Sequence, residues 1–238
     1  MEVLKETPHL IAYIDLLGVK ELIKSDSSQY SLNTINSLYD LMKNFPEKHN
    51  FKLLNELTFR AFSDNFILSL PISNDDNENR IRLEALSMYV AVFQLSYLTS
   101  FQILCRGCIT FGNFFVNENI VWGEALIRGY TVESSIAIYP RVLLDIENDE
   151  ICKLSKGSKI INKYYYIDND GQVCLNCFHN RIISVMYEKS KNLQDIEKVF
   201  EAELNITKNN EKAHQKWNWA YNAYMNHKEV SEQDVKNE

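Results

Sequence analysis

The segment HLIAYIDLLG, residues His9–Gly18, is the stretch around which this chain of 238 residues is organised. Its first six residues have the apolar, aromatic and β-branched composition of a strand, and Leu17-Gly18 breaks that pattern. Asp15 lies between the two parts, so we expect its carboxylate at a strand end, where a side chain faces a site instead of the core. A single carboxylate of this kind does not by itself indicate a metal-binding or catalytic site.

A second acid interrupts apolar residues further along the chain. Asp64 stands between strands predicted over residues 51–62 and 66–70, which would form a hairpin with Ser63-Asp64-Asn65 as its turn. Two carboxylates at neighbouring strand ends suit a pair of Mg²⁺ or Mn²⁺ ions, because hard cations prefer carboxylate oxygens and share their shell with water and phosphate. We predict that Asp15 and Asp64 form that pair.

Composition narrows the class of protein. Hydrophobic residues make up 45% of the chain and charged residues 24%, as in an ordinary globular protein, and we predict a domain over residues 1–190 with a helical extension over 191–238. The net charge of −7 argues against nucleic acid as a partner, although a basic pocket for one nucleotide stays open. The apolar runs are too short for a membrane span and the N-terminus lacks a signal-peptide core, so we expect a cytoplasmic protein without membrane association.

The five cysteines suggest reduced thiols in a cytosolic protein. Four of them form two Cys-x-x-Cys pairs, Cys105/Cys108 and Cys174/Cys177, a spacing that a four-thiolate zinc site would use. Both pairs fall in predicted strands, where residues three apart point to opposite faces. Buried thiols are therefore favoured, and zinc is the alternative.

Helices and strands are expected along the rest of the chain from hydrophobic periodicity and from turn residues. The helices are predicted at residues 19–24, 32–42 with an end near Pro46, 80–97, 124–138 and 193–228. Strands are predicted at 101–116, 141–145, 164–167 and 173–178. Asp168-Asn169-Asp170-Gly171 is expected to be a hairpin turn, and a calcium loop is disfavoured because no Glu closes its spacing. Trp217 and Trp219 are expected in core packing, with a subunit interface as the alternative.

The order of these motifs resembles the class III nucleotidyl cyclase catalytic domain, from about Leu10 to Asp145. Two departures stand within it: Ser63 replaces a glycine that is commoner there, and the first glycine after Arg106 is shifted by one position. The motifs that carry the resemblance are Ile14-Asp15-Leu16-Leu17-Gly18, Phe62-Ser63-Asp64, Arg106-Gly107-Cys108-Ile109-Thr110-Phe111-Gly112, Trp122-Gly123 and Glu133-Ser134.

More narrowly, AYIDLLG, FSD and GEALIRGYTVES followed by YPR resemble the bacterial anti-phage Pycsar pyrimidine cyclases. The resemblance implies an α+β, ferredoxin-like cyclase domain, with a mainly antiparallel central sheet, packed helices, and a C-terminal β-hairpin and helical extension. It implies that UTP, or else CTP, is converted to a 3′,5′-cyclic nucleotide and pyrophosphate with two Mn²⁺ or Mg²⁺ ions. It also implies a homodimer with composite active sites and a separately encoded effector that the product activates.

The resemblance assigns the metals to Asp15, Asp64 and the backbone carbonyl of Leu16. The transition-state asparagine and arginine of the family fall on Ile127 and Thr131, which offer neither a matching hydrogen bond nor a charge.

Arg128, next to Ile127, is therefore predicted to supply the catalytic charge, with Arg106 on the strand as the alternative and as a substrate contact. Thr58 stands where purine cyclases have a base-reading lysine, and an expected acid before Trp122 is replaced by Ile120 or Val121. We predict that Thr58, Arg60 or Tyr130 reads a pyrimidine instead. Thr58 and Arg60 share a strand face, so both pointing to solvent is the alternative.

Two other functions remain open at this point. A catalytically silent cyclase-like dimer could serve as a regulatory module that binds a nucleotide or a protein, given Ile127 and Thr131. A nucleotidyltransferase that joins nucleotides could use a similar pair of metal ions.

Overall fold

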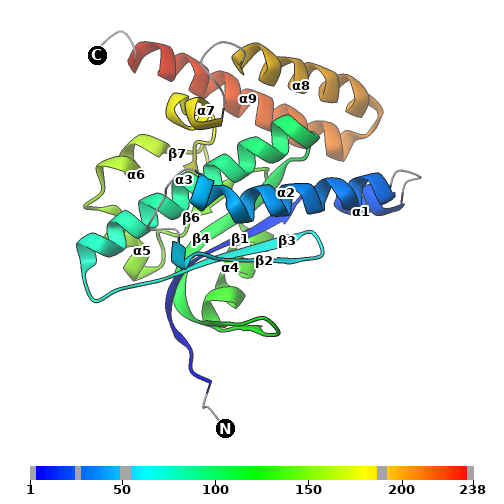
Figure 1. Cartoon of the computed structure of the whole chain (residues 1–238). Coiled ribbons are helices and arrows are strands. Elements are labelled where there is room, and N and C mark those ends of the chain that lie inside the picture. The colour runs from blue at the N-terminus through cyan, green and yellow to red at the C-terminus, as the bar shows by residue number, and fades with distance from the viewer. Residues whose placement is uncertain (1–3, 25–27, 49–54, 187–191, 235–238) are drawn as a thin grey trace.

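The computed structural model describes residues 4–24, 28–48, 55–186 and 192–234 (Figure 1). Its strands are β1 (Thr7–Leu16), β2 (Thr58–Phe62), β3 (Asn65–Pro71), β4 (Cys105–Val116), β5 (Val121–Trp122), β6 (Val142–Leu144), β7 (Tyr165–Ile167) and β8 (Val173–Leu175). Its helices are α1 (Val19–Lys24), α2 (Ser28–Lys48), α3 (Asp76–Phe101), α4 (Glu124–Ser135), α5 (Asp149–Ser155), α6 (Lys159–Tyr164), α7 (Asn180–Met186), α8 (Asn192–Ile206) and α9 (Glu211–Asp234).

Within the described residues these strands form an eight-stranded sheet in the order β2-β3-β1-β4-β6-β8-β7, with β5 paired to β4. The β4–β6 pair is parallel and the other pairs are antiparallel. Strand β1 lies between β3 and β4, and its register places Asp15 between Asn65 of β3 and Arg106 of β4. The predicted α+β class, with a mainly antiparallel sheet and packed helices, is confirmed.

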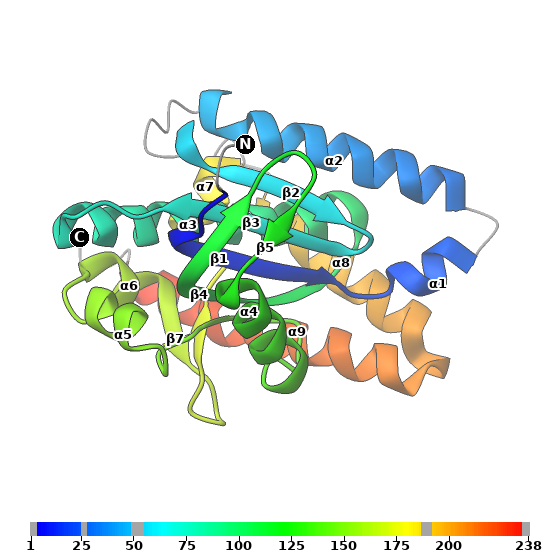
Figure 2. The ribbon, with the colours of Figure 1, turned by 90° about the horizontal axis from the view of Figure 1, so that it is seen from below.

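The two faces of the sheet carry different helices, and β1 shows which side chain goes where. Leu10, Ala12 and Ile14 enter the main core, which also contains the buried side chains of α3. Ile11 and Tyr13 face the other way and pack with α4. Figures 1 and 2 show α4 on the opposite side of the sheet from α3. Because side chains alternate along a strand, Asp15 belongs to the α4 face.

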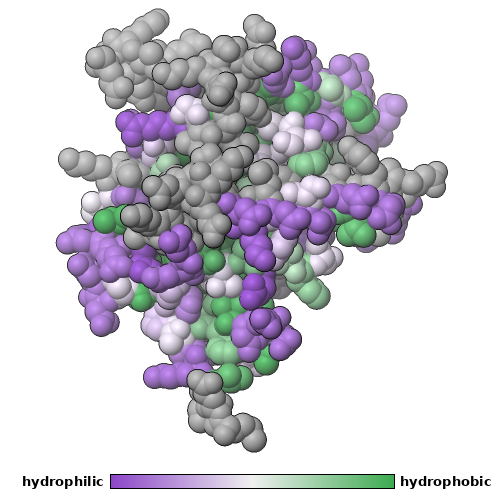
Figure 3. Space-filling model, viewed as in Figure 1, coloured by the Kyte–Doolittle hydropathy of each residue, from purple (hydrophilic) through white to green (hydrophobic). Residues whose placement is uncertain are grey.

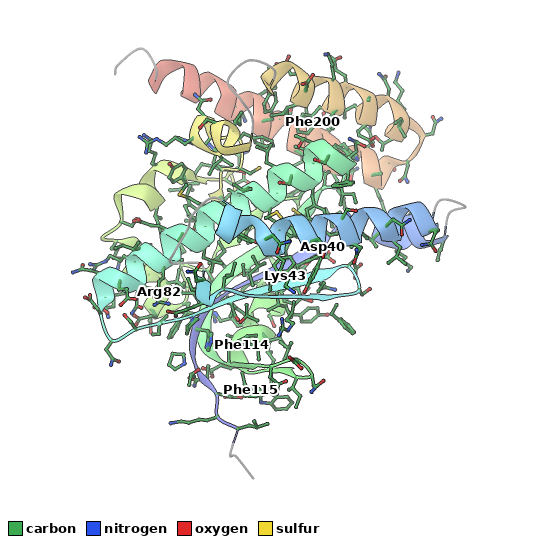
Figure 4. The ribbon with its side chains drawn as sticks, in the orientation of Figure 1. Asp40, Lys43, Arg82, Phe114, Phe115 and Phe200 are labelled. Carbon is green, nitrogen blue, oxygen red and sulfur yellow. The ribbon has the colours of Figure 1, made fainter. Side chains whose placement is uncertain are left out.

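The C-terminal helices belong to the main core. Phe200 of α8 and Trp217 and Tyr224 of α9 are buried in the same hydrophobic cluster as β1, and Phe200 lies in the helical layer above the sheet (Figure 4). Trp219 stacks on Tyr139 at 5.4 Å between ring centroids, so the predicted core packing of the tryptophans is confirmed. The predicted helix over 193–228 is broken by a short 3₁₀ turn at Thr207–Asn209.

Several element boundaries differ from the predicted ones. Helix α2 continues to Lys48, past the predicted end at Pro46, and β2 begins only at Thr58, while residues 51–54 of the predicted strand lie outside the described part of the chain. Helix α3 runs to Phe101 and β4 starts at Cys105, because α3 is buried nearly all round and its pattern marks no end. Similarly, α4 ends at Ser135. The short helices α5, α6 and α7 carry too few turns to show a periodicity and were not predicted.

The cysteine pairs confirm the prediction of opposite faces. Cys105 and Cys177 lie in the main core, whereas Cys108 and Cys174 lie in a cluster with Val132 of α4. Burial raises the pKa of each of these thiols, and in the described residues no three His, Cys, Asp or Glu side chains are grouped to hold a metal ion. Among the same residues no helix is both long enough and apolar enough to cross a membrane.

Candidate active site

The end of β1 and the β2–β3 hairpin bring Asp15 and Asp64 together. Asp15 pairs with Asn65, the residue after Asp64, and the Leu16 amide donates to the Asp64 carbonyl oxygen at 2.9 Å. Ser63 turns the hairpin with a φ of 56°, a left-handed conformation that explains why glycine suits this position. The backbone therefore fixes the two acids at neighbouring positions, as predicted from the sequence.

The electrostatics of Asp15 reflect this crowding. The pKa of Asp15 is raised overall, mainly by burial and also by the charge of Asp64. The hydrogen bond and charge of Arg106, and the charge of Lys216 on α9, lower it in part. The neighbouring carboxylate thus makes ionisation of Asp15 costlier, which is the condition that a bound cation relieves.

The donor atoms at this place fit a hard divalent cation. Asp15 and Asp64 would offer carboxylate oxygens and Leu16 a backbone carbonyl oxygen. Mg²⁺ and Mn²⁺ prefer oxygen ligands of this kind, whereas zinc sites typically use sulfur and nitrogen. Asp64 is partly exposed, which leaves room for water or phosphate in the shell.

Arg106 links Asp15 to a third acid on the same face of the sheet. Its Nε lies 3.1 Å from Asp15 Oδ2 and 2.5 Å from Glu133 Oε1 of α4. The Glu133 side chain is only 3% exposed. Burial raises the pKa of Glu133 to about 7, with Arg106 lowering it and Asp15 and Asp64 raising it. Arg106 thus lies beside Asp15, one of the two predicted metal ligands. This position is compatible with both roles predicted for Arg106, the supply of catalytic charge and contact with the substrate.

Arg128 lies elsewhere within the chain. Its guanidinium forms a two-point ion pair with the buried carboxylate of Asp145, which also accepts a hydrogen bond from Thr110 Oγ1 at 2.6 Å. Thr110 is four residues along β4 from Arg106, a separation of roughly 13 Å at the rise of a strand. A single chain therefore does not bring Arg128 to Asp15 and Asp64.

The exposed side of α4 carries the positions that departed from the family pattern. Ile127 is 69% exposed, and Thr131 is exposed with its hydroxyl bonded to the Ile127 carbonyl oxygen at 2.7 Å. Tyr130, also exposed, packs edge-on against Tyr13 at 6.0 Å between ring centroids. Ile127 and Thr131 are thus exposed to solvent, whereas Tyr130 leans against Tyr13 of the sheet while more than half of its side chain stays exposed.

A cleft of about 680 Å³ opens between the β2–β3 hairpin, the β4–β5 hairpin and α4. Of the four predicted substrate contacts it contains Arg60 and Tyr130, while Thr58 and Arg106 lie outside its lining. Arg60 donates to the carbonyl oxygens of Asn117 at 3.3 Å and Phe59 at 3.0 Å, so it lines the cleft instead of extending into solvent. Ile120, Val121, Leu126 and Ile67 supply apolar walls.

Large apolar side chains surround this cleft on the surface. Phe62 of β2 is 77% exposed and Trp122 of β5 is 66% exposed. Figure 3 shows hydrophobic residues gathered on the lower part of the molecule, where α4 and the strands beside it lie in Figure 1. An apolar surface of this kind is typical of a face that meets another protein.

Two residues of the site carried no predicted role. Glu133 was recognised only as part of a motif, because its contact with Arg106 joins a helix to a strand. Lys216 influences Asp15 from α9, about two hundred residues further along the chain, and no local pattern marks such a contact.

Comparison with known proteins supports the fold. No family model matches the sequence, and no curated protein matches it. The monomeric guanylyl cyclase domain of the RhoGC fusion protein from the aquatic fungus Blastocladiella emersonii is similar at a TM-score of 0.50 and 12% identity, over 73% of this chain and 96% of that one. The chain therefore has the class III cyclase fold, as predicted.

Two further solved structures are similar at lower scores. The catalytic core of a rhodopsin-guanylyl cyclase with converted specificity, in complex with ATPαS, gives a TM-score of 0.49 and 11% identity over 72% of this chain and 96% of that one. A class III adenylyl cyclase-like ATP-binding protein from Pseudomonas aeruginosa gives 0.48 and 7% identity over 76% of this chain and 41% of that one.

Proposed function

We propose that this chain is a metal-dependent pyrimidine nucleotide cyclase, which converts UTP, or CTP as the second choice, to a 3′,5′-cyclic nucleotide and pyrophosphate. The observation that carries the proposal is the pairing of Asp15 and Asp64 on the α4 face of a class III cyclase fold. Two neighbouring carboxylates at this position would hold the two Mg²⁺ or Mn²⁺ ions, with the carbonyl of Leu16 as a further ligand.

The reaction joins the ribose 3′-oxygen to the α-phosphorus and breaks the bond to the oxygen that bridges the α- and β-phosphates. The hydroxyl proton passes to solvent, and pyrophosphate leaves. When bound, the two ions lower the pKa of the 3′-hydroxyl and neutralise the charge on the leaving group. Asp15 and Asp64 keep a fixed spacing, because the amide of Leu16, the residue after Asp15, is hydrogen-bonded to the carbonyl oxygen of Asp64. A fixed spacing of the two carboxylates would favour a productive geometry for the reaction.

The cleft supports a pyrimidine in preference to a purine. Its wall is apolar at Ile120 and at Val121 of β5, where purine cyclases of the family have an acid, and Arg60 presents guanidinium donors. Uracil offers two carbonyl acceptors to such donors and a flat face to Tyr130. Thr58, half-buried two residues before Arg60, is the second candidate for contact with the base.

The distribution of the site residues over the surface supports a homodimer with composite sites. The metal acids belong to one subunit, and the cleft with α4 of the other subunit would cover them, burying Phe62, Trp122 and Ile127. Arg128 is our candidate for the transition-state charge in that arrangement, because its side chain is 38% exposed on α4 next to Ile127.

The segments AYIDLLG, FSD and YPR support a role in anti-phage signalling. We propose that the product is a second messenger that activates a separately encoded effector in the cytoplasm. The net charge of −7 argues against a nucleic-acid partner and is compatible with one nucleoside triphosphate bound in a local pocket.

A panel of UTP, CTP, ATP and GTP, each incubated with the purified protein and Mn²⁺ and resolved by mass spectrometry, tests the proposal. Cyclic UMP or cyclic CMP as the main product is the expected result, and a cyclic purine nucleotide as the main product would contradict the proposed specificity. Linear or dinucleotide products would indicate a nucleotidyltransferase.

A silent regulatory dimer is the second candidate function. It is favoured by the exposed Ile127 and Thr131 and by the engagement of Arg128 with Asp145. Nucleotide binding without turnover of any of the four nucleotides would support it.

A further inference from the structure

Arg106 stands between two carboxylates at the place where a cation is expected. Its Nε donates a hydrogen bond to Asp15 Oδ2 at 3.1 Å and lies 2.5 Å from Glu133 Oε1. We propose that Arg106 is an internal counter-ion which Mg²⁺ or Mn²⁺ displaces from Asp15, and that Glu133 is the positioning residue which receives it. The inference rests on the proposed function, since it requires a metal ion at Asp15 and Asp64.

The hydrogen-bond geometry supports two positions for the guanidinium. The Nε–H of Arg106 is directed at Asp15, and Glu133 Oε1, although close, makes no hydrogen bond with any of the described residues. One N–H cannot satisfy both acceptors fully, so Glu133 holds a buried acceptor in reserve. A small rotation of the side chain would move the hydrogen bond from Asp15 to Glu133.

The backbone around Arg106 restricts the motion to its side chain. A Cβ on Gly107 would lie 2.3 Å from the carbonyl oxygen of Tyr13, so only glycine fits at this position. The pairing of β4 with β1 on both sides of Arg106 holds the backbone of this residue in the sheet. The Gly107 amide also donates to the carbonyl oxygen of Arg141 at 3.0 Å. Arg106 therefore responds to a cation by rotation of its side chain.

A close approach of α4 to the sheet brings Glu133 into reach. A Cβ on Gly129 would lie 2.9 Å from Tyr13 Cβ, so α4 nearly touches β1 there. Glu133 follows Gly129 by four residues and shares its face of the helix, which directs the carboxylate toward the strand pair β1–β4. Glu133 is thus anchored on a rigid element, as a residue that positions another side chain must be.

The contacts of Arg106 allow the charge of Asp15 to be balanced both without and with a bound cation. Without a cation, Asp15 and Asp64 are adjacent like charges, and Arg106 neutralises Asp15. With a cation bound, an arginine left at Asp15 would repel it and occupy a ligand oxygen. Glu133 gives the displaced guanidinium an anionic partner, so that metal binding does not leave a partly buried arginine without a counter-charge.

The first test is a crystal structure of the protein with and without Mn²⁺. We expect the Arg106 Nε–Asp15 Oδ2 hydrogen bond to be absent in the Mn²⁺-bound crystal and replaced by one to Glu133. Arg106 still bonded to Asp15 with Mn²⁺ in place would overturn the inference.

The second test measures Mn²⁺ affinity by calorimetry in the absence of nucleotide at about pH 8, where Glu133 is ionised. Glu133→Gln should weaken binding about tenfold, as removal of outer-shell partners does. Arg106→Gln should strengthen binding, because it removes the competitor for Asp15. Glu124→Gln, which removes an exposed charge from the same helix, is the matched control and should leave the affinity unchanged.

The outcomes separate this inference from the proposed function. If Asp64→Asn abolishes Mn²⁺ binding while Glu133→Gln binds as the wild type does, or while Arg106→Gln also weakens binding, the metal site stands and the inference fails. A purely structural Arg106–Glu133 pair predicts that both variants weaken together. If Asp64→Asn has no effect on Mn²⁺ binding, the metal assignment fails and the inference with it. Unfolding temperatures of the variants check that each is folded.

Discussion

The backbone amide of Leu16 donates a hydrogen bond to the carbonyl oxygen of Asp64, with 2.9 Å between the nitrogen and the oxygen. This bond ties the end of β1 to the turn of the β2–β3 hairpin through the main chain. The spacing of Asp15 and Asp64 is therefore independent of their side chains. A substitution of either carboxylate can therefore remove a proposed metal ligand without displacing its neighbour.

Asp64→Asn should accordingly abolish cyclic product while the fold is kept. We expect turnover to fall by more than about 100-fold, since even outer-shell partners of metal sites contribute about 10–100-fold. Product is measured by mass spectrometry at saturating Mn²⁺, and the unfolding temperature should stay within a few degrees of the wild type. Turnover near the wild-type rate would refute the metal assignment.

Arg60→Gln should weaken the binding of UTP. Arg60 lines the cleft, and its guanidinium is the charged donor there, held by the carbonyl oxygens of Phe59 and Asn117. Loss of a hydrogen bond from a charged group costs about 1.5–3 kcal/mol, so KM for UTP should rise by roughly tenfold or more with a smaller change in kcat. Arg181→Gln on the exposed surface of α7 is the control. An unchanged KM would remove Arg60 from the base pocket.

Arg141 should be essential to the stability of the C-terminal part of the fold. Its side chain is 2% exposed and is ion-paired with Asp168 and Asp170 of the β7–β8 turn, while its guanidinium lies 6.0 Å from the ring of Trp219. Arg141→Met should lower the free energy of unfolding by about 3 kcal/mol, because it leaves Asp168 without its cation. Urea denaturation measures this.

The control for Arg141 is an exposed ion pair. Asp76→Asn removes the surface contact with Lys153, both partners of which are about half exposed, and should cost less than about 1 kcal/mol. Equal losses of unfolding free energy in Arg141→Met and Asp76→Asn would show that burial of Arg141 does not strengthen its contribution to stability.

The sequence predicted the local parts of this site and missed the parts that join distant segments. Asp15 and Asp64 were predictable, because Asp15 lies at the end of one strand, Asp64 follows another, and the turn at Ser63 keeps the next strand adjacent. The ion pair of Arg128 with Asp145 was not, since it spans the loop between α4 and β6 and depends on how the helix lies on the sheet. The same holds for Glu133 with Arg106, which only tertiary packing brings together.

Glu133 should make the stability of the fold depend on pH. Burial, opposed by Arg106 and assisted by Asp15 and Asp64, raises its pKa from 4.5 to about 7. The folded chain then holds the proton more tightly than the unfolded chain. This contribution to stability is complete below about pH 4.5 and is lost as the pH rises through about 7.

Relative to Glu133→Gln, the wild-type free energy of unfolding should therefore fall by about 3 kcal/mol between pH values of about 4.5 and 8. Urea denaturation at several pH values without metal ions measures the difference. Parallel curves for the two proteins would show that Glu133 titrates normally.

Mixing two inactive variants should restore activity if each site is shared between subunits. Asp64→Asn removes the metal half, and Ile127→Glu places a negative charge at the cleft on α4, where Ile127 is 69% exposed and the substitution leaves the core intact. A heterodimer of the two has one damaged site, which carries both changes, and one intact site. Random exchange of subunits makes half of the dimers mixed, so the mixture should recover about a quarter of wild-type activity. A site built within one chain predicts no recovery, because every subunit then carries one of the two changes.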